Sequence, residues 1–300
     1  MLFLSVGDAA MADDGATWRL DQIGQLRQWA EAAREDALPP PSTDTLDRAL
    51  ASGAAPGEAA SELALRLARL HLLGATPPPL RGGWHIADPD TAVDLAALLK
   101  QALVSGSIDA FFSGLRPAHP DYQALRTALA READPARRAT IALNMERWRW
   151  MPRAPGRDYL LVNAAAFDVR FWRSGTPAGH WRIIAGKPAT PTPVFSTTVT
   201  GVILNPWWTV PASIVRERRG RFPAAQGYVR SGGQVRQRPG PGNALGAIKL
   251  DMPNRFSVYL HDTPNKALFG REARAFSHGC IRVDDAPGFA AALLAGTGTS

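Results

Sequence analysis

The feature that most constrains this 300-residue chain is a change of periodicity near its midpoint. Before residue 148, apolar residues recur at the three- and four-residue spacing of one helix face. After residue 150, aromatic and β-branched residues gather in short runs that are typical of strands. This order predicts an α+β chain, with an all-helical region followed by a mainly β region.

The helical region is predicted over residues 17–148. Its apolar residues at helical spacing are Leu20, Ile23, Leu26, Ala30 and Ala33; Leu63, Leu67 and Leu70; and Leu95, Leu98, Leu99 and Leu103. Proline runs at 39–41 and 77–79 separate these helices, because proline lacks an amide N–H. Asp134 and Pro135 are typical of an N-cap and a first helical position, and predict a further helix ending at Trp148.

The β region is predicted to begin with a hairpin. The predicted strands are 159–164, 167–173, 181–185, 194–204 and 256–261. Ser174–Pro177 forms a turn between the second and third strands, since Gly and Pro mark chain reversals. A short helix is predicted over residues 287–294.

Charge divides the chain at about the same place. Residues 1–135 carry 11 basic and 18 acidic side chains, a net charge of −7, whereas residues 136–300 carry 23 and 9, a net charge of +14. The second half therefore suits an anionic partner. Arg216–Arg221 would suit nucleic acid, but zinc-finger spacing, an RNP-type motif and a periodic recognition helix are all missing. A solvated arginine-rich loop, or attraction to a carboxylate-rich polymer, is therefore favoured over nucleic acid.

Composition and the N-terminus bear on location. The sequence has no apolar run of the roughly 18 residues that a membrane-spanning helix needs, so no stable membrane insertion is expected. Leu2–Val6, followed by Ala10-Met11-Ala12, is consistent either with the remnant of an export signal or with an ordinary terminus. One cysteine cannot form an intramolecular disulfide.

That single cysteine, Cys280, is the candidate nucleophile. It follows Ser277-His278-Gly279 rather than lying in an apolar run, and the glycine lets the backbone approach a bound group closely. A thiol of ordinary pKa needs a base or a cation to become a nucleophilic thiolate. His278 lies two residues away, but His261, delivered by a paired strand, is the better-placed base.

A family resemblance rests on these residues. His261-Asp262-Thr263-Pro264, followed by Ser277–Val283, resembles the signature of the L,D-transpeptidases, whose catalytic module is the YkuD domain. Further blocks resembling the YcbB-like branch are Asn144–Pro152, Gly186–Pro188 with Thr192–Ser196, Asn205–Trp208 with Val210–Pro211, and Pro239–Gly246. The resemblance implies a helical scaffold domain over 17–143 and a YkuD-type β-sandwich over 144–300, with a lid-like insertion around 206–246. A peptidoglycan-binding domain that longer members insert has no room here.

The resemblance also implies an activity in the periplasm or cell envelope. A cysteine attacks the third residue of a peptidoglycan tetrapeptide stem, releases D-Ala and passes the acyl group to an amine of a second stem, and carbapenems acylate it. The implied catalytic residues are Cys280 as nucleophile, His261 as base, His278 and Ser277 shaping the site, and Gly279 as an oxyanion donor together with the Cys280 amide. The implied substrate-binding residues are Arg282, Trp207, Trp208 and Asn243. No cofactor or metal is expected.

Three alternatives remain open at this point. Water in place of the amine would make the protein an L,D-carboxypeptidase with the same residues. A non-catalytic peptidoglycan-binding module would use the basic β region without chemistry. A zinc site could use His261, His278 and Cys280, although three ligands without a second motif are weak support. A papain-like protease would place its cysteine before its histidine, opposite to the order here.

Overall fold

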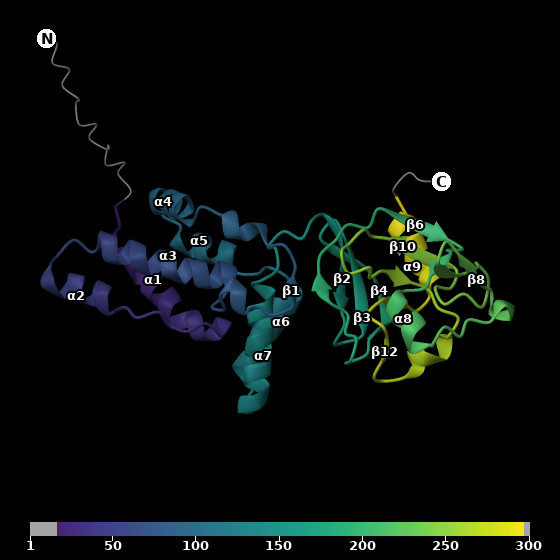
Figure 1. Cartoon of the computed structure of the whole chain (residues 1–300). Helices are drawn as coiled ribbons and strands as arrows, with labels where there is room; N and C mark the ends of the chain where they lie inside the picture. Colours follow the sequence, from purple (N-terminus) through teal and green to yellow (C-terminus); the bar gives the residue numbers. More distant parts are fainter. Residues whose placement is uncertain (1–16, 297–300) are drawn as a thin grey trace, which may run out of the picture. The chain divides into compact units, whose positions relative to one another are not determined.

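The computed structural model describes residues 17–296, so the export-signal hypothesis for residues 2–12 lies outside the described residues. The chain forms two compact units that divide after Arg153, with Gly83–Ile86 belonging to the second. Figure 1 shows helices up to α7 and mainly strands beyond it, which confirms the predicted fold class. The domain limits 17–143 and 144–300 stay a prediction.

The first unit is helical. Its helices are α1 Leu20–Ala32, α2 Asp44–Ser52, α3 Gly57–Leu73, α4 Leu95–Ser105, α5 Ile108–Leu115, α6 Pro120–Arg131 and α7 Pro135–Trp148. The predicted apolar faces of α1, α3 and α4 supply buried residues such as Leu26, Leu67 and Leu99 to one core. Asp134 caps α7 as predicted, because its side chain accepts a hydrogen bond from the Ala136 amide. Helices α2, α5 and α6 were not predicted individually.

A buried polar cluster holds α6 and α7 to the 3₁₀ turn that follows α1. The Asp36 carboxylate lies 2.6 Å from Arg116 and accepts a 2.9 Å hydrogen bond from the Tyr122 hydroxyl. Arg149 donates to the same hydroxyl and to the Asp36 carbonyl. Each partner is needed, because an unpaired charge in an apolar interior is strongly destabilising.

Asp36→Ala should therefore lower the free energy of unfolding of the helical unit by about 3 kcal/mol, since it leaves the largely buried Arg116 without its counter-charge. Urea denaturation followed by far-ultraviolet circular dichroism measures this change. Asp21→Ala is the matched control, because Asp21 pairs with Arg19 on the surface, where water and salt leave such pairs little net effect on stability. Equal effects of the two substitutions would contradict the assignment.

The second unit is built from short strands and two helices. Its strands are β1 Trp84–His85, β2 Asp158–Asn163, β3 Asp168–Arg173, β4 Thr176–Gly186, β5 Val194–Phe195, β6 Gly201–Leu204, β7 Trp208–Thr209, β8 Tyr228–Ser231, β9 Gln234–Gln237, β10 Ile248–Asp251, β11 Leu260–His261, β12 Ala275–Ser277 and β13 Ile281–Val283; its helices are α8 Ala212–Glu217 and α9 Ala286–Leu294. The predicted hairpin and the short helix near the end of the chain are confirmed.

Two predicted strands are shorter or divided. The run 194–204 separates into β5, which pairs with β1, and β6, which pairs with β10. In the run 256–261, the Asn254 side chain accepts hydrogen bonds from the Phe256 and Val258 amides, and Ser257 has a φ of 54°. This local bonding competes with strand pairing, so β11 keeps two residues.

Eight strands form one sheet with the path β2-β3-β4-β13-β11-β10-β6, and β12 pairs with β4 beside it. Strands β2, β3 and β4 lie side by side in Figure 1, in agreement with their pairing. A separate three-stranded sheet, β7-β9-β8, lies within residues 206–246 and has its own small core around Trp208 and Tyr228. The site is built where β11 and β13 meet.

Candidate active site

Cys280 lies in the short loop between β12 and β13, and both strands pair with β4. Ser277 is aligned with Gly186, and Arg282 with Ile184. The Ser277 hydroxyl donates a 2.5 Å hydrogen bond to the Cys280 carbonyl and accepts one of 3.1 Å from the Gly279 amide. The buried serine thus fixes the backbone on both sides of the sulfur.

Gly279 gives the loop its sharp turn. Its φ of 114° lies in a region that side chains disfavour, so glycine is required here. Its carbonyl accepts a 2.9 Å hydrogen bond from the Thr192 hydroxyl. Because its amide already donates to Ser277, an oxyanion role for Gly279 would need this bond to open, and that role stays a prediction.

Strand register gathers four side chains on one face of the sheet. In the parallel pair β11–β13, Leu260 is aligned with Ile281 and His261 with Arg282. Side chains alternate between faces along a strand, so Cys280 shares a face with Arg282, and Tyr259 with His261. The predicted delivery of His261 by a strand next to the cysteine is therefore observed.

The surroundings of Cys280 act on its pKa in opposite directions. Burial raises the pKa of the thiol, because a thiolate loses hydration there. Hydrogen bonds with the backbone and hydroxyl of Tyr259, and the positive charges of Lys249 and Arg282, favour the thiolate and partly offset burial. Lys249 Nζ lies 4.3 Å from the centroid of the Tyr259 ring. The partly buried sulfur itself lies 3.8 Å from the Ser257 carbonyl.

His261 is buried and held by backbone groups. Its Nδ1 is bonded to the Asp262 carbonyl, which can only accept, so Nδ1 carries a hydrogen. Burial, followed by the charge of Arg282, lowers the pKa of His261 to about 4, so the ring is neutral at pH 7. Among the described residues no hydrogen bond joins His261 to Cys280. Catalytic hydrogen bonds of this kind often tighten only when substrate binds.

The residue after His261 anchors its position. The Asp262 carboxylate lies 2.5 Å from Lys266 Nζ and accepts a 2.8 Å hydrogen bond from the Ala247 amide. Gly246 leaves room for it, because a Cβ at that position would lie 2.3 Å from Asp262 Oδ2. The carbonyl that orients the imidazole is thus fixed from two directions.

His278 has different contacts from His261. Its Nε2 lies 2.6 Å from Glu217 Oε2, at the end of α8, and 3.4 Å from Lys187 Nζ. These contacts agree with the expectation that His278 shapes the site rather than deprotonates the thiol, which stays a prediction.

The four expected substrate-binding residues lie in different settings. Trp207 is 44% exposed, with the Arg236 guanidinium 4.6 Å from its ring centroid, whereas Trp208 is buried in the small core against which Tyr259 packs. The side-chain amide of Asn243 is buried and donates to backbone carbonyls, including that of Pro206. These hydrogen bonds hold the backbone of the insertion and do not point to a substrate contact. Arg282 faces the sulfur, and its buried Nε has no hydrogen-bond partner among the described residues.

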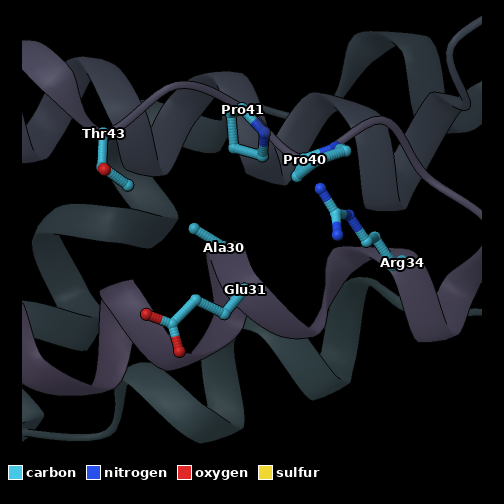
Figure 2. A pocket seen from close by; sticks show the side chains of 6 residues that line it. All are labelled: Ala30, Glu31, Arg34, Pro40, Pro41 and Thr43. Carbon is cyan, nitrogen blue, oxygen red and sulfur yellow. The ribbon is translucent and has the colours of Figure 1, made fainter.

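The zinc hypothesis finds no support in the arrangement of side chains. Within residues 17–296, no group of three or more His, Cys, Asp or Glu residues is placed to hold a metal ion. A separate cavity of about 290 Å³ lies in the helical unit and is lined by Ala30, Glu31, Arg34, Pro40, Pro41 and Thr43 (Figure 2). None of these residues is the candidate nucleophile.

None of the helices within residues 17–296 combines the length and the apolar character that spanning a membrane requires.

Sequence reasoning missed three contributors to the site: Tyr259, Lys249 and Thr192. Tyr259 lies two residues before His261, so strand alternation alone would have placed it on the same face. Lys249 becomes visible only through the pairing of β10 with β11, which aligns it with His261. Thr192 opens one of the blocks that resemble the family, but its contact with Gly279 could not be predicted, because the two residues lie 87 positions apart in the sequence.

The reactivity of the Cys280 thiol should depend on the Tyr259 hydroxyl. Tyr259→Phe removes a hydrogen bond that favours the thiolate, so the pKa of Cys280 should rise and alkylation by iodoacetamide at pH 7 should slow by about tenfold per unit of pKa. Rates measured across pH report on one site, because the chain has one cysteine.

Tyr228→Phe is the control for this measurement, since that hydroxyl bonds to Arg218 at 3.1 Å instead. An unchanged pH profile in the Tyr259 variant would show that this hydroxyl does not affect the pKa of Cys280.

Comparisons with known proteins agree with the site. Residues 157–299 match the YkuD family model, described as the L,D-transpeptidase catalytic domain, and residues 13–129 match the scaffold domain model. A protein of Haemophilus influenzae named as a candidate L,D-transpeptidase is 29% identical over 182 residues, which cover 51% of this chain and 37% of that protein. The chain thus spans well under half of that relative's length.

Solved structures of L,D-transpeptidases are similar at a lower level. A mutant of the Enterococcus faecium enzyme is 18% identical, with a TM-score of 0.32, over 50% of this chain and 49% of that one. L,D-transpeptidase 3 from Mycobacterium tuberculosis is 17% identical, with a TM-score of 0.29, over 43% of this chain and 52% of that one. The YcbB-like branch stays a prediction.

Proposed function

We propose that this chain, which carries a YkuD-type L,D-transpeptidase catalytic domain after a scaffold domain, is a peptidoglycan L,D-transpeptidase of the periplasm or cell envelope. The observation that carries the proposal is the setting of Cys280. Its sulfur lies on a loop closed by the Ser277 hydroxyl. Burial raises the pKa of the thiol, and Tyr259, Lys249 and Arg282 partly offset this by favouring the thiolate. The strand that brings His261 lies alongside.

The first half of the reaction forms a thioester. His261, neutral at pH 7, takes the thiol proton, and the sulfur attacks the carbonyl carbon of the third residue of a donor tetrapeptide stem. The C–N bond to D-Ala then breaks, and the imidazolium returns the proton to the leaving amine. Backbone amides of the Cys280 loop are the candidate donors to the oxyanion.

The second half transfers the acyl group. An amine of an acceptor stem attacks the thioester carbon and His261 takes the proton of that amine. The C–S bond then breaks, and the leaving sulfur takes the proton from the imidazolium, which restores the thiol. Transfer must outrun hydrolysis, which requires an oriented acceptor and a shielded thioester. The insertion around 206–246 is the candidate lid, and its Trp208 belongs to a core against which Tyr259 packs.

Recognition of the stem peptide rests on cationic and aromatic groups. Arg282 faces the sulfur and can bind a peptide carboxylate through paired hydrogen bonds. The exposed ring of Trp207 offers an apolar contact near the lid. The net charge of +14 over residues 136–300 favours approach to a carboxylate-rich wall polymer over nucleic acid.

The test is incubation of the protein with tetrapeptide-bearing muropeptides, followed by mass spectrometry. We expect cross-linked dimers and free D-Ala, loss of both by at least about a thousandfold with Cys280→Ala, and covalent addition of a carbapenem at Cys280. Tyr228→Phe serves as a folded control outside the chemistry.

Other outcomes would point elsewhere. D-Ala without dimers would indicate an L,D-carboxypeptidase, in which water reaches the thioester. Binding without turnover would indicate a peptidoglycan-binding module. Activity that survives in the Cys280 variant would contradict the proposal outright.

A further inference from the structure

A carboxylate already lies beside the nucleophile loop, and it belongs to the protein. Glu217, the last residue of α8, places Oε2 2.6 Å from His278 Nε2 and Oε1 3.6 Å from Lys187 Nζ. The carboxylate can only accept, so His278 donates from Nε2. Both oxygens of one carboxylate are therefore held by nitrogen donors from two other elements.

The composition of the lid makes this contact unusual. Residues 206–246 contain seven arginines, at 216, 218, 219, 221, 230, 236 and 238, and a single acid, Glu217. Glu217 borders a cavity of about 320 Å³ together with Arg218, Arg219 and Arg221. Its ion pairs nevertheless go to Lys187 and His278 rather than to these neighbouring arginines.

The two nitrogens are fixed relative to the sulfur. His278 lies two residues before Cys280, on the loop that Ser277 staples. The backbone amide of Lys187 donates a 2.9 Å hydrogen bond to the Ser277 carbonyl, so the backbone of the lysine is attached to the start of the same loop. Lys187 and His278 thus place two nitrogen donors beside the loop of the nucleophile.

Glu217 is held less firmly. Its side chain is 53% exposed, and it ends a helix of six residues. Exposed ion pairs contribute little net stability, because water and salt compete with them. A second carboxylate that reaches the same two nitrogens could therefore displace it without unfolding the lid.

We propose that Lys187 and His278 form a carboxylate-binding subsite for the donor stem peptide, and that Glu217 occupies it as an internal substitute until the peptide carboxylate displaces it. The inference rests on the proposed function, because it names a substrate contact of the same site. A donor carboxylate is favoured over an acceptor one, since the subsite is anchored on the loop of the nucleophile that takes the acyl group.

The test measures equilibrium binding in a Cys280→Ala background, where turnover cannot interfere. Isothermal calorimetry would compare the tetrapeptide with two amidated forms, one blocked at the C-terminal carboxylate and one at the remaining carboxylates. Lys187→Gln should weaken binding of the free peptide about tenfold, as loss of a charge-assisted contact does. One of the two amidated peptides lacks the carboxylate that the subsite recognises. Lys187→Gln should leave the affinity for that peptide unchanged. Lys187→Arg should retain most of the affinity.

Glu217→Gln should act in the opposite direction and tighten binding of the free peptide severalfold, because the internal competitor loses its charge. Arg221→Gln is the matched control, since it removes one positive charge from the same lid outside the subsite. It should leave the ratio of affinities for free and amidated peptides unchanged. Thermal unfolding midpoints would verify that each variant folds.

Several results would overturn the subsite. They are an equal loss of affinity for free and amidated peptides in Lys187→Gln, weaker binding in Glu217→Gln, and no binding of the peptide at all. Failure of the proposed function is distinguishable, because the Cys280-containing protein would then bind the peptide with the expected dependence on Lys187 and yet release no D-Ala.

Discussion

The site depends first on the Ser277 hydroxyl, which closes the nucleophile loop from within. It accepts from the Gly279 amide and donates to the Cys280 carbonyl, while β12 and β13 fasten both ends of the loop to β4. A thiol on an unconstrained loop would sample many orientations, and most of the rate gain from positioning would be lost. The sheet therefore determines where the sulfur lies.

Burial acts on both members of the proposed catalytic pair. It raises the pKa of Cys280 and lowers that of His261, so the resting state favoured by desolvation is a neutral thiol beside a neutral imidazole. Proton transfer creates two charges in this setting. Tyr259 and Lys249 stabilise the thiolate, and backbone hydrogen bonds with Asp262 and Leu245 stabilise the imidazolium. Groups fixed in advance in this way lower the free energy of charge separation without further reorganisation.

Local patterns predicted what local interactions determine. The helices with long apolar stripes, the Asp134 cap and the β2–β3 hairpin follow from spacing within one segment, and the cysteine stood out by its neighbours. Alternation along one strand places Tyr259 on the face of His261, but the place of Tyr259 and Lys249 beside Cys280 depends on the register of β10, β11 and β13 and could not be predicted in the same way. Two-residue strands such as β11 leave too short a pattern for periodicity to detect.

The candidate lid, residues 206–246, is firmly attached at its base. Trp208, Val210, Tyr228, Val235 and Leu245 form a core of its own. The Asn243 amide bonds to the carbonyls of Pro206 and Arg238, which ties the start of the insertion to its end. The end of α8 is held differently, because Glu217 is exposed and reaches the loop of Cys280 through ion pairs. Entry of a peptide then calls for movement of that helix end, while the base of the insertion can keep its place beside Tyr259 and limit the access of water to a thioester.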